Sequence, residues 1–436
     1  MINLTDETHD QSARSWVETA NLEDGDFPIQ NLPIGVFTTR DHRAPRIGVR
    51  VGDEVVDLVR LLDTRLMNID TNEDEALRQP TLNSWMALGR RSSSTLRRSL
   101  FELLHSRTVG PTREAVSTCL VPLGDCTMLL PTVTGDFTDF YTSIHHARRA
   151  GEAIRGDATL NPNFRSIPIG YHGRSSSIAL SGAPCHRPYG VTGADSGYRP
   201  SEKLDFELEV GFFVGRTSDE KKPIGVDAAD DHLFGFCLVN DWSARDIQRW
   251  ESVPLGPFLA KSFATSTSAW IVTTEALAPF RVAPVTRESD APRLATELTS
   301  AAHSATGALD LMLSVTLQSR IMREAGMPGT VIGNPNFKDQ YWSAAQMLAH
   351  HASNGCPLRS GDLISSGTVS GPTPDDSGCL LERTRDGKLP LTLPSGEMRS
   401  YLSDGDIVTF SGRCSREGFR SIGFGECVAE VVGAAG

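Results

Sequence analysis

Cysteine pairs and long apolar runs are missing from this chain of 436 residues. Its eight cysteines form no C-x-x-C pair and no spacing typical of a zinc cage or a disulfide framework, so we expect reduced thiols. No apolar run approaches the length of a membrane span. The polar, acidic N-terminus has neither the basic nor the apolar region of a secretory signal. The sequence therefore predicts a cytoplasmic protein without a membrane partner.

Positive charge is scarce as well. Lysine and arginine number 42 against 54 aspartates and glutamates, which gives a formal net charge of -12. A nucleic-acid-binding surface needs a basic face or stripe, so we expect no nucleic-acid partner. Charged residues at 22% and hydrophobic residues at 39% are typical of soluble globular proteins. The acidic balance suits a metal site.

The chain divides into a small and a large part, with a junction near residue 130 that prolines and glycines indicate. Short apolar runs before the junction alternate with turn residues and predict a small β-rich domain. Glycine-bounded strands dominate after it. We expect a polar extension over 1–25, a small domain over 26–130 and a strand-rich mixed domain over 131–436. The predicted fold class is mostly β or α+β.

The individual elements follow from the periodicity of apolar residues. Strands are predicted at 35–39, 46–51, 54–58, 176–180, 204–214, 233–240, 269–273, 308–317, 362–366 and 406–410. Helices are predicted within 81–104 and at 243–250 and 340–353.

Acids and apolar residues alternate strictly in the stretch 204–210. Successive strand side chains point to opposite faces, so Asp205, Glu207 and Glu209 share one face. Glu207 and Glu209 would lie about 6 to 7 Å apart and repel by roughly 2 to 3 kcal/mol at an effective dielectric near 20. A solvated strand face is the usual explanation of such a pattern; a cation bound between the acids is the alternative.

Three further segments carry reactive side chains. Asp139, Tyr141 and His146 fall within 135–146, although each could be a turn former, a cap or a hydrogen-bonded structural residue. Asp241 ends a strand, and Ser243 with Asp246 forms a capping box that predicts a helix start. The structural alternative for Asp241 stays open.

Arg245 and Gln248 share one face of that helix because they are three residues apart. Lys261 and Thr265 follow in an apolar segment, where the lysine either snorkels to solvent or pairs with the carboxylates. The serine- and glycine-rich segment 365–372, followed by Glu382, has donors that suit an anionic ligand, but a plain turn has the same composition.

The four carboxylates of Asp139, Glu207, Glu209 and Asp241 have no cysteine or histidine cluster around them. All-oxygen ligation favours hard cations. The sequence therefore predicts a Ca²⁺ or Mg²⁺ site, with Mn²⁺ as a further candidate.

The same residues carry a resemblance to the fumarylacetoacetate hydrolase family, and it runs from about Asp26 to Cys427. The motifs that carry it are Asp136-Phe-Thr-Asp-Phe-Tyr, Pro168-Ile-Gly-Tyr-His-Gly-Arg, Leu204-Asp-Phe-Glu-Leu-Glu, Asn240-Asp-Trp-Ser-Ala-Arg-Asp-Ile-Gln, Pro254-Leu-Gly-Pro-Phe-Leu and Tyr341-Trp with His350-His351. The resemblance implies a small N-terminal barrel of the Src-homology-3 type, a large C-terminal mixed β-sandwich roll and a homodimer. It also implies hydrolysis of a carbon-carbon bond of 4-fumarylacetoacetate.

The resemblance further implies a role for each matching residue. Metal ligation falls to Asp139, Glu207, Glu209 and Asp241, with Lys261, Thr265 and Asp241 at a neighbouring magnesium site. Catalysis falls to His146 as general base, Glu382 as its partner, and Arg245, Gln248 and Lys261 as oxyanion donors. Substrate contact falls to Tyr141, Arg155, Tyr171, Gln248 and Thr368.

Ser252 is a departure from the resemblance, because the family usually has a tyrosine that contacts substrate at this position. Residues 279–335 and 1–25 also match poorly. The alternatives are another activity of the same superfamily, namely an acylpyruvate hydrolase, a hydratase or an oxaloacetate decarboxylase, and a non-catalytic metal-binding homologue.

Overall fold

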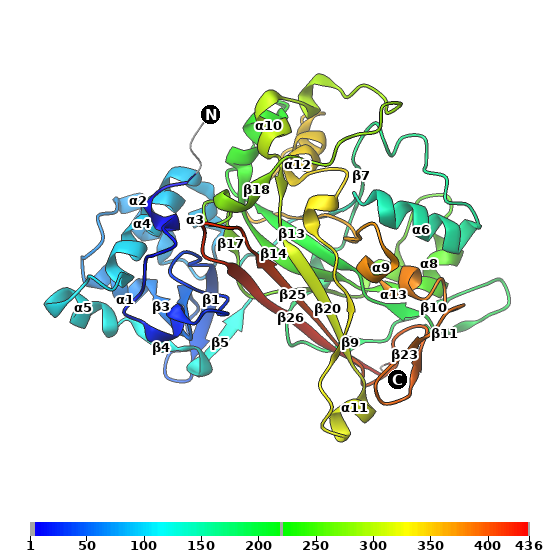
Figure 1. The fold of residues 1–436 in the computed structure, drawn as a ribbon, viewed down its shortest axis with the longest axis horizontal. Coiled ribbons are helices and arrows are strands. Elements are labelled where there is room, and N and C mark those ends of the chain that lie inside the picture. The colour runs from blue at the N-terminus through cyan, green and yellow to red at the C-terminus, as the bar shows by residue number, and fades with distance from the viewer. Residues whose placement is uncertain (1–4, 219–220, 435–436) are drawn as a thin grey trace.

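The computed structural model describes residues 5–218 and 221–434, which form a small and a large β-rich part (Figure 1). The small part holds a five-stranded antiparallel sheet in the order β4-β3-β2-β1-β5, with helices beside it. Its strands are β1 (Ile34–Thr39), β2 (Arg46–Val51), β3 (Glu54–Asp57), β4 (Leu120–Pro122) and β5 (Cys126–Leu129). Its helices are α1 (Leu58–Asp63), α2 (Thr71–Leu77), α3 (Asn83–Ala87), α4 (Arg90–Leu104) and α5 (Gly110–Ser117).

The N-terminal segment 5–25 packs against the end of α4. The Ser15 hydroxyl donates to the Leu104 carbonyl at 2.8 Å, and the Trp16 indole donates to the Leu103 carbonyl at 2.9 Å. Val17 joins a hydrophobic core that the small part shares with strands of the large part. This segment is therefore structured although its sequence shows little periodicity.

The large part contains two facing sheets. The first has the order β7-β6-β22-β13-β14-β16-β8, with β17 also paired to β14, and the second has the order β21-β20-β25-β26-β9. The strands of the first sheet are β6 (Phe137–Tyr141), β7 (Ile169–His172), β8 (Ile178–Leu180), β13 (Leu208–Val214), β14 (Leu233–Asp241), β16 (Thr265–Thr267), β17 (Val272–Thr273) and β22 (Leu363–Ser365). Those of the second are β9 (Cys185–His186), β20 (Met312–Gln318), β21 (Thr330–Gly333), β25 (Ile407–Cys414) and β26 (Ile422–Val432).

Short two-stranded ribbons and helices surround these sheets. The ribbons pair β10 (Tyr189–Val191) with β11 (Tyr198–Pro200), β12 (Leu204–Asp205) with β15 (Ser243–Ala244), β18 (Arg281–Val282) with β19 (Ala308–Leu309), and β23 (Leu391–Thr392) with β24 (Met398–Arg399). The helices are α6 (Ile144–Arg155), α7 (Val226–Ala229), α8 (Arg245–Glu251), α9 (Leu259–Ser262), α10 (Ala301–Thr306), α11 (Arg320–Glu324), α12 (Ala344–Ala352) and α13 (Leu380–Arg383).

One hydrophobic core joins the two facing sheets. Phe212 and Leu238 of the first sheet and Val315 and Phe410 of the second belong to the same buried cluster. In Figure 1, β20, β25 and β26 cross β13 and β14, in agreement with this packing. The predicted class, with a small N-terminal β domain and a large C-terminal β-rich domain, is confirmed. Among the described residues, no helix combines the length and apolarity that a membrane crossing needs.

Several local predictions differ from the structure. The strand predicted at 308–317 breaks between β19 and β20, and the strands predicted at 176–180 and 269–273 are shortened to β8 and β17. The strand predicted at 204–214 is interrupted, because β12 pairs with β15 while β13 pairs with β14 and β22. The capping box is wrong: Ala244 caps α8, and Ser243 lies in β15. Asp246 instead accepts from the hydroxyl of Ser201 at 2.5 Å.

Candidate active site

Strand register collects polar side chains at one end of the first sheet. Asp139 of β6 pairs with Tyr171 of β7 on one side and with Ser365 of β22 on the other. Asp241 at the end of β14 pairs with Thr265 of β16. Paired residues lie side by side across a sheet. Register thus brings distant segments of the chain to a single location.

Four carboxylates meet at this sheet end: Asp139, Glu207, Glu209 and Asp241. One oxygen from each lies within 4.8 Å of the others, and all four side chains are buried. The solvated strand face is therefore excluded. Burial and the charge of Asp241 raise the pKa of Asp139 well above its usual range, and burial with the charge of Asp139 does the same to the pKa of Glu209. A cation would relieve this repulsion.

Glu209 offers a direct test of whether the residues fit a cation. One of its carboxylate oxygens accepts from the Ser365 hydroxyl. The other, Oε1, is buried and finds no hydrogen-bond donor within the described part of the chain. An unpaired buried charge is costly, and a hard divalent ion is the partner that a set of four carboxylates prefers. The residues present fit such an ion.

Lys261 and Thr265 contact the same cluster. The Lys261 ammonium is buried and donates to Glu207 and, at 2.7 Å, to Asp241 Oδ2, while the Thr265 hydroxyl donates to Asp241 Oδ1 at 3.1 Å. Burial alone would lower the pKa of Lys261, but the charges of Asp241 and Glu207 outweigh it and raise this pKa. The lysine is thus a charge partner of the carboxylates rather than a snorkelling side chain.

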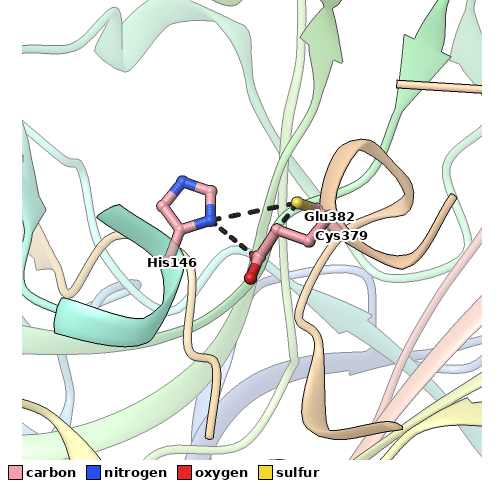
Figure 2. Close-up of side chains that lie close together, drawn as sticks. All are labelled: His146, Cys379 and Glu382. Atoms are coloured by element: carbon pink, nitrogen blue, oxygen red, sulfur yellow. Dashed lines mark hydrogen bonds and ion pairs between the residues drawn. The ribbon is translucent and has the colours of Figure 1, made fainter. Parts of the chain in front are cut away.

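His146 and Glu382 form a buried pair beside the carboxylates. The His146 Nδ1 lies 2.6 Å from Glu382 Oε1, and Ser370 and Arg149 donate to the same carboxylate at 2.7 Å each. Figure 2 shows the pair with Cys379 next to it. Burial would favour the neutral acid, but His146 and Arg149 lower the pKa of Glu382 to about 2. A charged Glu382 fixes the proton on Nδ1 and leaves Nε2 as a proton acceptor.

Arg245 links Glu207 of the carboxylate cluster to Asp205. Its Nε donates to Asp205 Oδ2 at 2.9 Å, and its Nη1 lies 2.7 Å from Glu207 Oε1 and donates to Gln248 Oε1 at 3.1 Å. Because the Gln248 oxygen faces Arg245, the amide nitrogen of Gln248 points the other way. Both residues present donors where α8 begins.

Asp205 supports Arg245 and has no place in the metal cluster. Its two oxygens accept from the backbone N–H groups of Leu380 and Leu381 at 2.8 and 2.9 Å. These two residues lie in α13 together with Glu382. Asp205 consequently ties α13 to α8.

Two tyrosines line the cluster. The Tyr171 hydroxyl donates to Asp241 Oδ2 at 3.0 Å, and burial with the charge of Asp139 raises the pKa of Tyr171. The Tyr141 ring meets the His146 ring edge-on, with centroids 5.2 Å apart. Burial raises the pKa of Tyr141 as well. Both phenols therefore stay protonated and can donate hydrogen bonds.

The other residues predicted to contact the substrate differ in burial. Thr368 is buried in the loop after β22. Arg155 is exposed at the end of α6, where it donates to the Thr159 carbonyl at 3.1 Å. Ser252 ends α8, and its hydroxyl donates to the Gln248 carbonyl. The structure thus does not bring Arg155 into the buried group.

The donors of segment 365–372 serve the protein's own carboxylates. The Gly367 N–H donates to Asp139 Oδ1 at 3.1 Å, alongside the Ser365 and Ser370 contacts described above. The interpretation of this segment as an anion-binding loop missed that role. Sequence reasoning also missed Arg149, whose position three residues after His146 on a helix places both on one face.

Comparisons with known proteins identify the class. The family model described as "Fumarylacetoacetate (FAA) hydrolase C-terminal" matches residues 137–432, and "Fumarylacetoacetase N-terminal" matches residues 30–131. The solved structure of a fumarylacetoacetate hydrolase from psychrophilic Exiguobacterium antarcticum covers 92% of this chain and 99% of its own, with a TM-score of 0.50 and 17% identity. That likeness shows the fold alone.

Curated relatives are closer in sequence. The fumarylacetoacetase of Bos taurus is 43% identical over 419 residues, 94% of this chain and 97% of the relative. Those of Homo sapiens and Arabidopsis thaliana are each 42% identical, and cover 94% and 96% of this chain and 97% and 98% of their own lengths. The chain belongs to the fumarylacetoacetate hydrolase family, and the resemblance predicted from its motifs is confirmed.

Proposed function

We propose that this protein is an enzyme that hydrolyses a carbon-carbon bond of 4-fumarylacetoacetate to give fumarate and acetoacetate, the last step of tyrosine and phenylalanine catabolism. The observation that carries the proposal is the buried His146–Glu382 pair beside a cluster of four carboxylates. Curated relatives named fumarylacetoacetase support the choice of substrate.

His146 is the general base in this proposal. Its Nε2 takes a proton from water, and the charged Glu382 at 2.6 Å from Nδ1 stabilises the imidazolium that results. Positioned acid–base catalysis contributes about 10²- to 10⁴-fold. The hydroxide attacks the carbonyl carbon next to the bond that breaks, and acetoacetate leaves as an enolate that regains a proton.

Arg245, Gln248 and Lys261 donate to the oxyanion that forms during this attack. Loss of one preorganised donor of this kind costs on the order of 3 kcal/mol. Arg245 is held on two sides by Asp205 and Glu207, so its direction is fixed before substrate binds. That rigidity avoids reorganisation during the reaction.

A hard cation belongs to the site. Asp139, Glu207, Glu209 and Asp241 would hold Ca²⁺, with Mg²⁺ at the neighbouring position formed by Asp241, Lys261 and Thr265; Mn²⁺ is a further candidate. Such an ion would polarise the diketone oxygens. As a protonated ammonium, Lys261 balances charge at the Mg²⁺ position and cannot ligate through Nζ.

Tyr141, Tyr171 and Thr368 contact the substrate in this proposal, and Arg155 pairs with a terminal carboxylate. Arg155 starts from an exposed position, so its side chain would turn inward on binding. Ser252 lacks the ring and phenol of the family tyrosine, and a water bridge to the substrate would take its place.

The assembly and location form a further proposal, a homodimer in the cytoplasm. No disulfide joins the eight cysteines, all of which lie in described parts of the chain. The segment 250–259 exposes several large apolar side chains, among them Leu255 at 96% and Phe258 at 70%. Exposed apolar groups of this kind favour burial in an interface.

A substrate panel tests the proposed function. The purified, metal-loaded enzyme is incubated with fumarylacetoacetate, acylpyruvates and oxaloacetate, and the products are identified. We expect fumarate and acetoacetate from the first compound at the highest kcat/KM. Preference for another compound would select the corresponding superfamily activity, and a bound cation without any cleavage would indicate a non-catalytic homologue.

A further inference from the structure

A sulfur atom lies beside the His146–Glu382 pair. Cys379 Sγ is 3.3 Å from Glu382 Oε1 and 4.0 Å from His146 Nδ1, and the nitrogen and the oxygen are 2.6 Å apart (Figure 2). All three side chains are buried. One nitrogen, one sulfur and one carboxylate oxygen thus lie within 4.8 Å of one another.

This atom set differs in chemistry from the four carboxylates. Zinc binds thiolate, imidazole and carboxylate atoms at about 2.0 to 2.3 Å, which sets ligand atoms in a tetrahedron about 3.3 to 3.7 Å apart. The separation of 3.3 Å lies at the lower limit of that range, 2.6 Å lies below it and 4.0 Å above it. Binding of the ion therefore requires His146 Nδ1 and Glu382 Oε1 to move apart and the sulfur to approach Nδ1. Hard cations prefer oxygen ligands only. The two clusters therefore select different ions.

We propose that His146, Cys379 and Glu382 form a second metal site, which takes a borderline-soft divalent ion such as Zn²⁺ and inhibits the enzyme when occupied. The inhibition rests on the proposed function, whereas the binding does not.

The binding step is balanced in protons. Cys379 loses its thiol proton to solvent as the sulfur bonds the ion. The Nδ1 proton of His146 moves to Nε2 as Nδ1 bonds the ion, and one oxygen of Glu382 provides the third bond. One proton is released for each ion bound. Because Nε2 now carries a proton, it can no longer take one from water, and the general base is lost.

The charges around the sulfur fit this step. Burial and the carboxylates of Glu382 and Asp205 raise the pKa of Cys379 well above its usual range, so a bare thiolate is disfavoured. The same negative groups favour a cation. Arg149 holds the other oxygen of Glu382 at 2.7 Å. Oε1 accepts from the Ser370 hydroxyl at 2.7 Å, and the ion would replace its contacts with His146 and Cys379. A divalent ion therefore supplies the positive charge that would stabilise the Cys379 thiolate.

The test uses Co²⁺ as a spectroscopic probe on the Ca²⁺-loaded enzyme. We expect one equivalent of Co²⁺ to produce a thiolate-to-cobalt absorption band, which Zn²⁺ abolishes by competition. Cys379→Ser removes the band, and Cys356→Ser, which changes a half-buried cysteine elsewhere, retains it. X-ray absorption of the Zn²⁺-loaded wild-type enzyme should show one sulfur ligand, a measurement that needs no variant. An all-oxygen shell, or a band that survives in Cys379→Ser, overturns the proposal.

Inhibition is measured separately, with each variant compared with its own zinc-free rate. We expect at least tenfold weaker inhibition by Zn²⁺ in Cys379→Ser. Inhibition that remains in this variant and is relieved by excess Ca²⁺ places Zn²⁺ in the carboxylate cluster and refutes the proposed site. A cobalt band in a protein that cleaves no diketone refutes the proposed function and leaves the metal site standing.

Discussion

Glu382 governs the behaviour of the histidine that the proposed reaction depends on. Its carboxylate accepts from His146 and Ser370 on one oxygen and from Arg149 on the other. These donors keep a fully buried acid charged. The charge in turn sets which nitrogen of His146 carries a proton.

His146→Ala should lower kcat by about 10²- to 10⁴-fold, because the proton acceptor is lost, while cation binding persists. The melting temperature should fall, because Glu382 loses one of its buried partners. Steady-state kinetics and calorimetry measure both. His145→Ala is the matched control, since this neighbouring, half-buried histidine has no contact with Glu382 among the described hydrogen bonds. Substantial turnover by purified, metal-loaded His146→Ala would remove this residue from the base role.

The pKa of Glu382 also predicts how stability depends on pH. It lies at about 2 in the folded protein, below the 4.5 that is ordinary for a glutamate. A lowered carboxyl pKa gives stability that is fully present above the unfolded pKa and is lost as pH falls towards the folded pKa. The shift amounts to about 3 kcal/mol. Glu382→Gln should therefore be less stable than wild type at pH 7, with a difference that shrinks as pH falls below about 4.5. Urea unfolding over this range measures it; a constant difference would contradict the assignment.

Asp205 positions Arg245, and this role can be tested by a single substitution. Asp205→Asn removes one of the two carboxylate charges that Arg245 faces, and breaking a buried ion pair costs about 3 to 5 kcal/mol. We expect a lower free energy of unfolding and a reduced kcat. Asp404→Asn, which alters an exposed carboxylate paired with Arg187, should change neither appreciably. Unchanged activity in a folded Asp205→Asn variant would mean that Arg245 needs no such support.

At the scale of elements, the carboxylate cluster depends on strands that pair with different neighbours. Glu207 precedes β13, Asp139 lies on β6, and Asp241 ends β14. A bound cation would hold these strands together through four carboxylates. Cation binding and strand packing are therefore linked.

Removal of the cation should abolish activity and lower stability. A ligand that binds only the folded state stabilises it by about 2.7 kcal/mol at a concentration of 100 times Kd. We expect a lower melting temperature after chelation, restored by Ca²⁺ or Mg²⁺, and a smaller gain from Ca²⁺ in Glu209→Gln. Calorimetry with and without chelator measures this. Full activity in a demonstrably metal-free sample would overturn the cation proposal.

Much of this arrangement could be predicted from sequence, because its signals are local. The alternation at 204–210 indicated Glu207 and Glu209, and the motifs around Asp139 and Asp241 completed the cluster. The interruption between β12 and β13 was not predictable, since it arises from pairing with β15 and β22 far along the chain. Local chemistry also misled at Ser243, where strand pairing prevailed over the capping pattern.

The hydrogen-bond donors that come from distant parts of the chain could not be predicted from sequence either. Gly367 and Ser365 hold Asp139 and Glu209, and no periodicity marks a loop residue as the partner of one particular carboxylate. The supporting contacts of the site therefore required the structure.

At the scale of the whole molecule, the exposed apolar segment 250–259 is the candidate for a subunit interface. Leu255 and Phe258 lie between α8 and α9, close in sequence to Gln248 of the site. In the proposed homodimer this segment is buried, and the subunit interface then adjoins the active site.

Leu255→Ser combined with Phe258→Ser should weaken the dimer, because apolar burial contributes about 25 cal/mol for each Å². Sedimentation velocity measures the shift towards monomer. Leu389→Ser, at an exposed apolar residue outside this segment, is the matched control. A double variant that sediments like wild type would place the interface elsewhere.

The parallel pairing of β22 with β6 has a consequence for the order of folding. Asp139 reaches its neighbour Ser365 only after more than half of the chain has been synthesised and has closed a long loop, and contacts of such long range form late and slowly. A cation cannot assist that search, because the carboxylates are still scattered along the unfolded chain. A bound cation would act afterwards, by slowing unfolding. A fragment that ends before residue 365 would keep all four acids and still lack the two donors that orient Asp139 and Glu209.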